Sequence, residues 1–519
     1  MYSIDKMSLA EKVGQMLSYG GATGGLGQQE QWTMQQMKQG LVGGVYMGYP
    51  HFRDPSQLKE IITSFQQVNP ISLFIGMDFE SGPAYNIASG CEDFPWPMGI
   101  GQIGSEEIAY RQGEIVGRQS AAMGVNFIYA PCVDVNLRYD NPIIGIRSFS
   151  SDVHVVVRMA TAFIKGCQKS GVICTAKHFP GGGDSTVDVH VDLSYAKKTI
   201  QQLEQLELLP YYSAIDAKVG SIMICHEVYP EIDPAELPAT LSSKIQTDLL
   251  RNKMKYDGII ISDSLSMGAI KKHFEPVESY IMAIEAGCDV LLLPPDPNAL
   301  PGIVKAVEAG RISEDRINES ATRILAAKNR FNEKQSSTQS IIKEDDEKFA
   351  REIGRRAVTI LKNEDVLPLP QDAKRLYVVQ WRPVEAEYFP REAGILSRLM
   401  HEIRLQDNSV EPPAFASVSK DCLQQQAETV LSKAKDVDIV VFLAIVKNYS
   451  CDLQMGLLSK RTVEMINSLT KSGRKVVLTI LGSPYILDQI PDVAGYICSY
   501  GDNNGAVEGI MQKLFHDKG

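Results

Sequence analysis

A dense group of titratable residues lies between positions 176 and 190, where the chain reads AKHFPGGGDSTVDVH. The group consists of Lys177, His178, Asp184, Asp188 and His190, with three glycines at 181–183. The apolar run GVICT directly before it is typical of a buried strand. A solvated charged loop is one interpretation of this segment. An active-site loop at the carboxyl end of a parallel strand accounts better for so many acids and bases close together, and we adopt it.

The Asp188-x-His190 pair has the residue types of a general acid/base. The pKa of an unperturbed imidazole is about 6.5, and a neighbouring carboxylate can orient the ring and support its protonated form. A D-x-H pattern alone is weak evidence, because a solvated loop can contain one.

Asp263 is a candidate nucleophile in the stretch GIIISDSLSM, residues 258–267. It follows a β-branched strand and is flanked by Ser262 and Ser264, whose hydrogen bonds would keep its carboxylate ionised. An ionised carboxylate can attack the anomeric carbon of a sugar. The alternative interpretation is an aspartate that caps the following helix.

Other polar residues also follow apolar runs that predict parallel strands buried on both faces. The predicted strands are 40–47, 72–78, 125–134, 171–179, 221–227, 257–263 and 287–293. The polar residues at their carboxyl ends are Asp78, Asp134, Lys177, His178, His226, Glu227 and Asp263. In a β/α barrel this end carries the active site, so we expect a common pocket.

The alternation of these strands with helices predicts an α/β chain whose first part is a (β/α)8 TIM-like barrel. Predicted helices follow Asp54-Pro55, Asp152 and Ser313. A doubly wound open sheet is the alternative, but no Gly-rich dinucleotide fingerprint follows the first strand.

We expect the barrel catalytic domain over residues 1–335, a polar linker over 336–348 and an α/β sandwich domain over 349–519. Strands at 376–380, 437–444, 476–481 and 494–500 are predicted for the sandwich. This domain has few convergent catalytic groups, so we interpret it as structural or as an accessory wall of the site.

Composition excludes several classes of partner. The 519 residues are 44% hydrophobic and carry a formal net charge of −11, which argues against a nucleic-acid or anionic-membrane surface. No apolar run approaches the roughly 20 residues of a membrane span. Ser8 and Glu11 form a capping box before Leu9, Val13, Met16 and Leu17, which predicts a helix instead of a signal peptide and therefore a cytoplasmic chain.

The nine cysteines form no C-x-x-C pair. We interpret them as buried hydrophobic residues in a reducing compartment and expect neither a disulfide framework nor a zinc site.

Taken together, the ordered motifs resemble glycoside hydrolase family 3, and more narrowly its β-N-acetylglucosaminidase branch. KHFPGGGDSTVDVH is similar to that branch's KHFPGHGD…D-S-H signature, and GIIISDSLSM to its nucleophile strand. NPIIGIRSFSSD resembles the segment with a sugar-binding arginine, here Arg147, and RRAVTILKNEDVLPL the start of the family's α/β sandwich domain.

The resemblance implies a role for each matching position. Asp263 would be the nucleophile of a retaining mechanism, and His190, held by Asp188, the general acid/base. The residues expected to bind the hydroxyl groups of the terminal sugar are Asp78, Arg147, Lys177 and His178. The branch uses no metal and no organic cofactor, and it acts on small oligosaccharides or glycoconjugates such as peptidoglycan or chitin fragments. The oligomeric state is not predicted.

The chain departs from the branch's pattern at several positions, four of which bear on function. The arginines of D-Q-E-G-G-R-V-x-R are Pro83 and Asn86 in DFESGPAYN, the histidine of P-G-H-G is Gly182, and the serine of D-S-H is Val189. These changes leave three alternatives to an exo-acting β-N-acetylglucosaminidase open. They are another β-glycosidase such as a β-glucosidase, a β-N-acetylglucosaminide phosphorylase, and a sugar-binding protein without catalysis, against which Asp263 and His190 argue.

Overall fold

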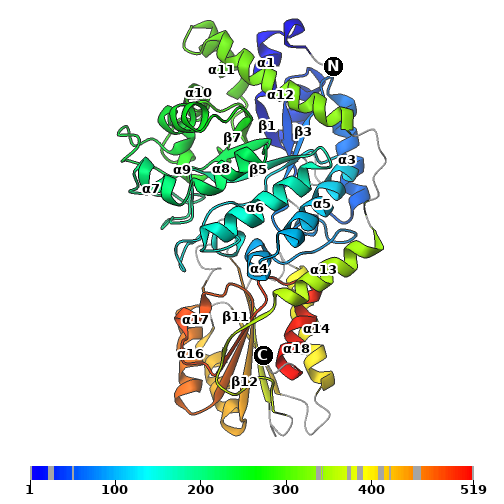
Figure 1. Ribbon diagram of the computed structural model, residues 1–519, viewed down its shortest axis with the longest axis vertical. Coiled ribbons are helices and arrows are strands. Elements are labelled where there is room, and N and C mark those ends of the chain that lie inside the picture. Colours follow the sequence, from blue (N-terminus) through cyan, green and yellow to red (C-terminus); the bar gives the residue numbers. More distant parts are fainter. Residues whose placement is uncertain are drawn as a thin grey trace. The chain divides into compact units, whose positions relative to one another are not determined.

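The computed structural model describes residues 3–21, 28–48, 52–334, 341, 343–370, 376–382, 390–406, 414–419, 422–447 and 457–516. The chain forms two compact units (Figure 1). The first comprises Met1–Glu92, Ser105–Ile144 and Ser148–Asp346, and the second Asp93–Gly104, Gly145–Arg147 and Glu347–Gly519. Six of the thirteen residues of the predicted linker, 336–340 and 342, lie outside the described residues, and a helix already begins at Glu344. The predicted domain limits stay predictions.

The first unit contains a sheet of eight parallel strands that curls into a barrel. The strands are β1 (Leu17–Gly20), β2 (Gly44–Tyr46), β3 (Phe74–Met77), β4 (Phe127–Ile128), β5 (Ile173–Phe179), β6 (Ser221–Ile224), β7 (Ile259–Ser262) and β8 (Leu291–Leu292). Their order is β7-β6-β5-β4-β3-β2-β1-β8. A parallel bridge from Ile261 to Val290 links the two outer strands, so the predicted barrel is confirmed.

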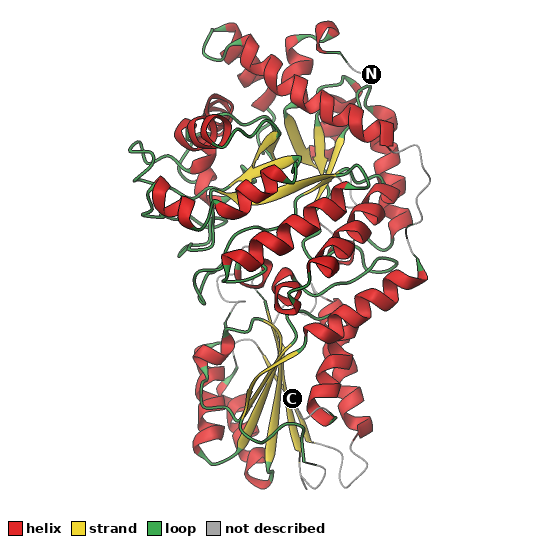
Figure 2. Cartoon of the chain, in the orientation of Figure 1, coloured by secondary structure: helices red, strands yellow, loops and turns green. Residues whose placement is uncertain are grey.

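Helices cover the outside of these strands (Figure 2). They are α1 (Leu9–Gln15), α2 (Gln28–Lys38), α3 (Pro55–Val68), α5 (Glu106–Met123), α6 (Val153–Gln168), α7 (Ile200–Gln205), α8 (Leu209–Asp216), α9 (Gly268–Lys271), α10 (Pro276–Ala286), α11 (Ala299–Glu308) and α12 (Glu314–Lys334). A π-helix, Lys244–Lys253, precedes β7. Asp54 and Asp152 cap α3 and α6 through side-chain oxygens that accept backbone N–H groups, as predicted.

The sequence interpretation missed one barrel strand, β1. Ser8 and Glu11 form the expected capping box, but α1 ends at Gln15 and Leu17 begins the strand. The assignment of Leu17 to the helix was therefore wrong. A four-residue strand that follows a helix after one residue has no separate apolar run by which to recognise it.

Two buried charged groups hold the amino-terminal end of the barrel. Lys328 on α12 donates from Nζ to Gln15 Oε1 at 2.7 Å and to the Gly43 carbonyl at 2.8 Å. Asp289, just before β8, accepts from the Ile260 N–H at 3.0 Å and from Ser320 Oγ at 2.6 Å. These contacts join the helices to the strands at the end opposite the polar strand ends.

The second unit is the predicted α/β sandwich, and its six-stranded sheet of order β11-β10-β12-β13-β14-β9 contains two strands, β9 and β11, beyond the four predicted. Its strands are β9 (Thr359–Asn363), β10 (Leu376–Arg382), β11 (Ala414–Ser419), β12 (Ile439–Val446), β13 (Lys475–Gly482) and β14 (Gly495–Cys498), and only β9 is antiparallel to its neighbour. Helices α14 (Pro390–Gln406) and α18 (Asn504–Phe515) lie on one side of this sheet, and α16 (Lys460–Lys471) and α17 (Ile486–Gln489) on the other (Figure 1). The remaining helices are α4 (Pro97–Ile103), α13 (Glu344–Ala357) and α15 (Gln424–Lys433).

None of the helices in the described part of the chain combines the length and hydropathy that a membrane span requires. The eight cysteines that the structure describes are free thiols, and all but Cys91 are buried, as expected for hydrophobic filling. Cys451 lies outside the described residues.

Candidate active site

Asp263 follows β7 at the carboxyl end of the barrel and is held by its backbone. Its N–H donates to the Ile224 carbonyl of β6 at 3.0 Å, and its Oδ1 accepts from the Ser264 N–H at 2.7 Å. Burial raises the pKa of the Asp263 carboxyl group, but His178, His226 and His190 outweigh burial and lower the pKa below its usual value. Asp263 is therefore an ionised carboxylate at neutral pH, but its described hydrogen bond comes from a backbone N–H, whereas the hydroxyl groups of Ser262 and Ser264 bond to Leu292 and Ser266.

Asp188 and His190 form the predicted dyad. Oδ1 of Asp188 accepts the backbone N–H of His190 at 2.9 Å and lies 2.7 Å from Nδ1 of the same ring. Asp188 is 1% exposed, whereas the His190 side chain is 22% exposed. Because a buried carboxylate binds Nδ1–H, it orients the ring and leaves Nε2 as the nitrogen for proton transfer.

The dyad and Asp263 lie at the same end of the barrel. His190 is one of the three histidines that lower the pKa of Asp263. In addition, the N–H of Gly268, in the segment after Asp263, donates to the His190 carbonyl at 2.9 Å. The structure thus brings the two predicted groups together, while their catalytic roles stay predictions.

Asp78, directly after β3, and Lys177 on β5 form a partly buried ion pair. Lys177 Nζ lies 2.7 Å from Asp78 Oδ1 and 2.7 Å from Glu80 Oε1. The Tyr46 hydroxyl donates to Asp78 Oδ2 at 2.8 Å. The lysine and the phenol therefore each bind one oxygen of Asp78 and together fix the orientation of its carboxylate.

Sequence reasoning missed Tyr46 and Glu80 as site residues. Tyr46 ends β2 and Glu80 comes two residues after Asp78, so each lies at or near the carboxyl end of a strand. The strand-end position that identified the other polar residues was therefore available for these two as well.

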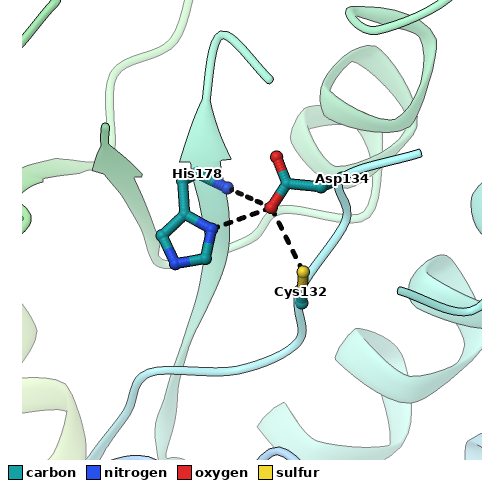
Figure 3. Close-up of side chains that lie close together, drawn as sticks. All are labelled: Cys132, Asp134 and His178. Atoms are coloured by element: carbon teal, nitrogen blue, oxygen red, sulfur yellow. Dashed lines mark hydrogen bonds and ion pairs between the residues drawn. The ribbon is translucent and has the colours of Figure 1, made fainter. Parts of the chain in front are cut away.

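His178 is anchored by Asp134, which the structure places beside it (Figure 3). Asp134 Oδ2 accepts the His178 backbone N–H at 3.0 Å and lies 2.8 Å from His178 Nδ1, and Oδ1 accepts the Gly182 N–H at 2.6 Å. Burial raises the pKa of Asp134, but the His178 ring and the hydrogen bonds outweigh it, so the pKa is lowered. An ionised Asp134 thus orients the imidazole of His178 and, through Gly182, the glycine loop.

Cys132, Asp134 and His178 together offer three atoms of metal-ligand type, all within 4.8 Å of one another. In this arrangement the Cys132 thiol donates to Asp134 Oδ2 at 3.1 Å, and His178 Nδ1 lies 2.8 Å from the same oxygen (Figure 3). The same oxygen of Asp134 thus binds both the Cys132 thiol and the His178 ring, so Asp134 holds the imidazole of His178 in place.

His226 contacts the loop that carries Asp263. Its Nε2 donates to the Ser264 carbonyl oxygen at 2.9 Å, and its Nδ1 lies 2.7 Å from Thr240 Oγ1. Burial lowers the pKa of His226, so the ring is neutral at pH 7 with its proton on Nε2, because a carbonyl oxygen can only accept. His226 therefore positions the backbone next to Asp263.

Two of the three loop glycines are required by close packing. A Cβ at Gly183 would lie 1.7 Å from the Val135 carbonyl oxygen, and Gly181 has a φ of +145°. At Gly182 the nearest atom to such a Cβ would be Asp134 Oδ1 at 3.6 Å, an ordinary contact. The position where the branch has histidine is thus the one with room for a side chain.

The remaining predicted residue is Arg147, and the two substituted arginine positions are Pro83 and Asn86. Arg147 ends a short 3-10 helix, Gly145–Arg147, that groups with the second unit, and its contact with a sugar stays a prediction. Pro83 begins another 3-10 helix, Pro83–Tyr85. Asn86 is 1% exposed and donates from Nδ2 to the Gly48 carbonyl at 2.8 Å, so it has a structural role in place of an arginine's charge.

The amino-acid sequence of this chain is similar to those of known proteins. Residues 8–327 match the glycosyl hydrolase family 3 N terminal domain. Beta-hexosaminidase A of Pseudoalteromonas piscicida is 27% identical over 404 residues, which are 71% of this chain and 67% of that protein.

Two solved structures are similar over almost the whole chain. A glycoside hydrolase family 3 beta-N-acetylglucosaminidase from Paenibacillus sp. str. FPU-7 is 27% identical with a TM-score of 0.84, covering 98% of this chain and 96% of that one. The beta-glucoside phosphorylase BglX bound to 2FGlc has a TM-score of 0.84 at 24% identity, covering 99% and 93%, and this likeness concerns the fold alone.

Proposed function

The chain belongs to glycosyl hydrolase family 3 and is a glycoside hydrolase, and from this premise we propose that it is an exo-acting, retaining β-N-acetylglucosaminidase. One observation carries the mechanism. Asp263 is an ionised carboxylate, and one of the histidines near it, His190, is paired with the buried Asp188. A nucleophile and a proton donor of different chemistry at one barrel end are what double displacement at a β-glycoside needs.

In the first step, Asp263 attacks the anomeric carbon and the glycosidic C–O bond breaks. The leaving oxygen takes the proton from Nε2 of the His190 imidazolium, while Nδ1–H stays bonded to Asp188. The products are a covalent glycosyl-enzyme ester, a neutral His190 and the free alcohol. Asp188 stabilises the protonated ring before this step, and the step consumes that charge.

In the second step, the neutral Nε2 of His190 takes a proton from water, and the water oxygen attacks the anomeric carbon. The bond to Asp263 breaks, and the sugar leaves with its original anomeric configuration. One imidazole thus serves first as acid and then as base, and both charges return to their starting values.

The terminal sugar would bind to Asp78, Lys177, His178 and Arg147. Tyr46 and Lys177 orient the carboxylate of Asp78, and Asp134 orients the ring of His178. Charge-assisted hydrogen bonds of this kind can strengthen as the sugar ring distorts towards the transition state. We therefore assign to these residues the recognition of a single non-reducing residue.

The activity is tested with 4-nitrophenyl β-N-acetylglucosaminide and 4-nitrophenyl β-glucoside at equal concentrations. We expect a higher kcat/KM for the N-acetylglucosaminide. A higher kcat/KM for the glucoside would instead identify the enzyme as a β-glucosidase. This alternative is open because Pro83 and Asn86 stand in place of the branch's arginines. No turnover of either substrate, or of other aryl glycosides, would indicate a sugar-binding protein.

The role of His190 is tested by leaving-group dependence. His190→Ala should lower kcat/KM for a phenyl glycoside on the order of 10²- to 10⁴-fold, since this leaving group needs protonation. A 2,4-dinitrophenyl glycoside leaves without a proton and should be affected far less. Equal losses on both substrates would contradict the assignment.

Phosphorolysis is the second candidate, because a neutral imidazole repels an incoming phosphate less than a carboxylate would. Phosphate would then replace water in the second step. Addition of millimolar phosphate should yield sugar 1-phosphate if this candidate is correct, and its absence would leave hydrolysis as the reaction.

A further inference from the structure

The loop that carries Asp188 and His190 is closed at both ends by one buried carboxyl group. Ser185 Oγ donates to Glu227 Oε1 at 2.9 Å, and Ser194 Oγ donates to the same oxygen at 2.7 Å. Glu227 follows β6 and is 1% exposed. A single oxygen from a neighbouring strand end therefore joins the first and last residues of the segment 185–194.

The second oxygen of Glu227 belongs to a chain of hydrogen bonds. Tyr229 Oη lies 3.0 Å from Glu227 Oε2 and 2.7 Å from the Gly181 carbonyl oxygen, but a phenol has only one proton to donate. If Glu227 is protonated, it donates to Tyr229 Oη, and Tyr229 donates to Gly181, so that all partners are satisfied. Burial raises the pKa of Glu227 against the opposing effect of its three hydroxyl partners, which favours this neutral form.

The tip of the loop rests on the segment that follows Asp263. The Gly268 N–H donates to the His190 carbonyl at 2.9 Å, and the Ala269 N–H donates to the Val189 carbonyl at 3.1 Å. Val189, at the position of the branch's serine, is buried in an apolar cluster with Met267 and Ala269. The loop is therefore attached through Glu227 at Ser185 and Ser194, through the Val228 N–H, which donates to the Ser194 carbonyl at 2.8 Å, and at its tip beside the nucleophile.

We propose that Glu227 is a positioning residue for the acid/base, which holds His190 within reach of the glycosidic oxygen by clasping the segment from Ser185 to Ser194. The proposal rests on the proposed function, because it assigns Glu227 an effect on proton donation by His190. Release of the clasp detaches the side chains of Ser185 and Ser194 from Glu227, so that the Ser185 end can shift, while the backbone bond from Val228 to Ser194 and the pairing of Asp188 with His190 stay in place. A displacement of about 1 Å at a reacting group can cost on the order of a hundredfold in rate.

The test compares Glu227→Leu with Glu227→Gln on phenyl and 2,4-dinitrophenyl glycosides of the sugar that the wild-type enzyme prefers. Leucine cannot accept from the two serines. Glutamine can accept both on its carbonyl oxygen and donate from its amide to Tyr229, as a protonated Glu227 would. We expect Glu227→Leu to lower kcat/KM for the phenyl glycoside roughly tenfold to a hundredfold more than for the dinitrophenyl glycoside, and Glu227→Gln to restore the ratio to within about threefold of wild type.

Two further variants separate positioning from general loss of stability. Asp233→Asn changes another buried acid after β6, which accepts a hydrogen bond from Ser242 Oγ at 2.6 Å. The described side-chain contacts of Asp233 include none with residues 185–194. Asp233→Asn should leave the substrate ratio unchanged. The double variant Ser185→Ala with Ser194→Ala removes the clasp and keeps Glu227. It should therefore give the same phenyl-to-dinitrophenyl ratio as Glu227→Leu. If Glu227→Leu does not fold, the double variant alone tests the proposal.

An unchanged phenyl-to-dinitrophenyl ratio in both Glu227→Leu and the double serine variant would overturn the proposal. So would a loss in Glu227→Gln equal to that in Glu227→Leu. His190→Ala distinguishes this failure from failure of the proposed function. If His190→Ala shows the leaving-group effect and the clasp variants do not, only the role of Glu227 is wrong. If His190→Ala also lacks the leaving-group effect, the acid/base assignment itself fails.

Discussion

Lys328 should make the stability of the barrel depend on pH between 7 and 10. Burial lowers the pKa of its ammonium group from 10.5 to about 7, and the cation lies 4.9 Å from the centre of the Phe74 ring at the amino-terminal end of the barrel. In the unfolded chain the pKa of lysine returns to about 10.4. Between these two values the unfolded chain binds one proton more than the folded chain, so the lysine's contribution to stability rises with pH.

The expected size follows from the separation of the two pKa values. Each pH unit within this range changes the free energy of unfolding by up to about 1.4 kcal/mol. From pH 7 to pH 9 the change integrates to about 2 kcal/mol, because the folded-state group is only half titrated at pH 7. Below pH 7 the cost of burying the cation is fully present, and above pH 10 it has disappeared.

The assay is guanidinium-chloride unfolding of the wild type and Lys328→Met at pH 7 and pH 9. The free energy of unfolding of the wild type should rise relative to that of the variant by about 2 kcal/mol between the two pH values. The sign of the difference at one pH is not diagnostic, since methionine also leaves Gln15 Oε1 and the Gly43 carbonyl without their donor. Lys305→Met, at an exposed position on α11, is the matched control and should show no such change. A difference between wild type and Lys328→Met that stays constant with pH, or falls as pH rises, would refute the reasoning.

Two further predictions concern the glycine loop and the amino-terminal end of the barrel. Gly183→Ala should lower kcat/KM more than tenfold, because the new Cβ would overlap the Val135 carbonyl oxygen. Gly182→Ala, which has room for a Cβ, should lower kcat/KM far less. Equal kinetics of the two variants would be inconsistent with this packing. Asp289→Asn should lower the free energy of unfolding by about 3 kcal/mol, because its buried carboxylate has Arg323 Nη1 at 3.2 Å among its cationic partners, and leave the phenyl-to-dinitrophenyl ratio unchanged. A shift in that ratio would show that this end of the barrel influences the active site.

Much of the site could be predicted because the carboxyl ends of parallel strands meet at one edge. Asp78 and Lys177 are 99 positions apart, and Lys177 Nζ nevertheless lies 2.7 Å from Asp78 Oδ1. Asp263 likewise comes within the field of His190. Strand ends can be read from apolar runs and the polar residues that follow them, so the topology alone brings these groups together.

The pairings within the site could not be predicted in the same way. Whether Asp134 would orient His178, or Glu227 would join Ser185 to Ser194, depends on side-chain directions and on the path of an irregular loop. Neither has a periodic signal in the sequence. The strand β1 escaped prediction for a related reason, because a four-residue element beside a helix has no pattern of its own.

The account depends most directly on a covalent bond between the sugar and Asp263. A 5-fluorinated dinitrophenyl N-acetylglucosaminide, which slows breakdown of the glycosyl-enzyme, is incubated with the protein, and the peptides are mapped by mass spectrometry. The account predicts one added sugar per chain on the peptide that contains Asp263, and no label on the Asp263→Ala variant. A label on another carboxylate, or an Asp263→Ala variant that still turns over substrate with retained configuration, would contradict it.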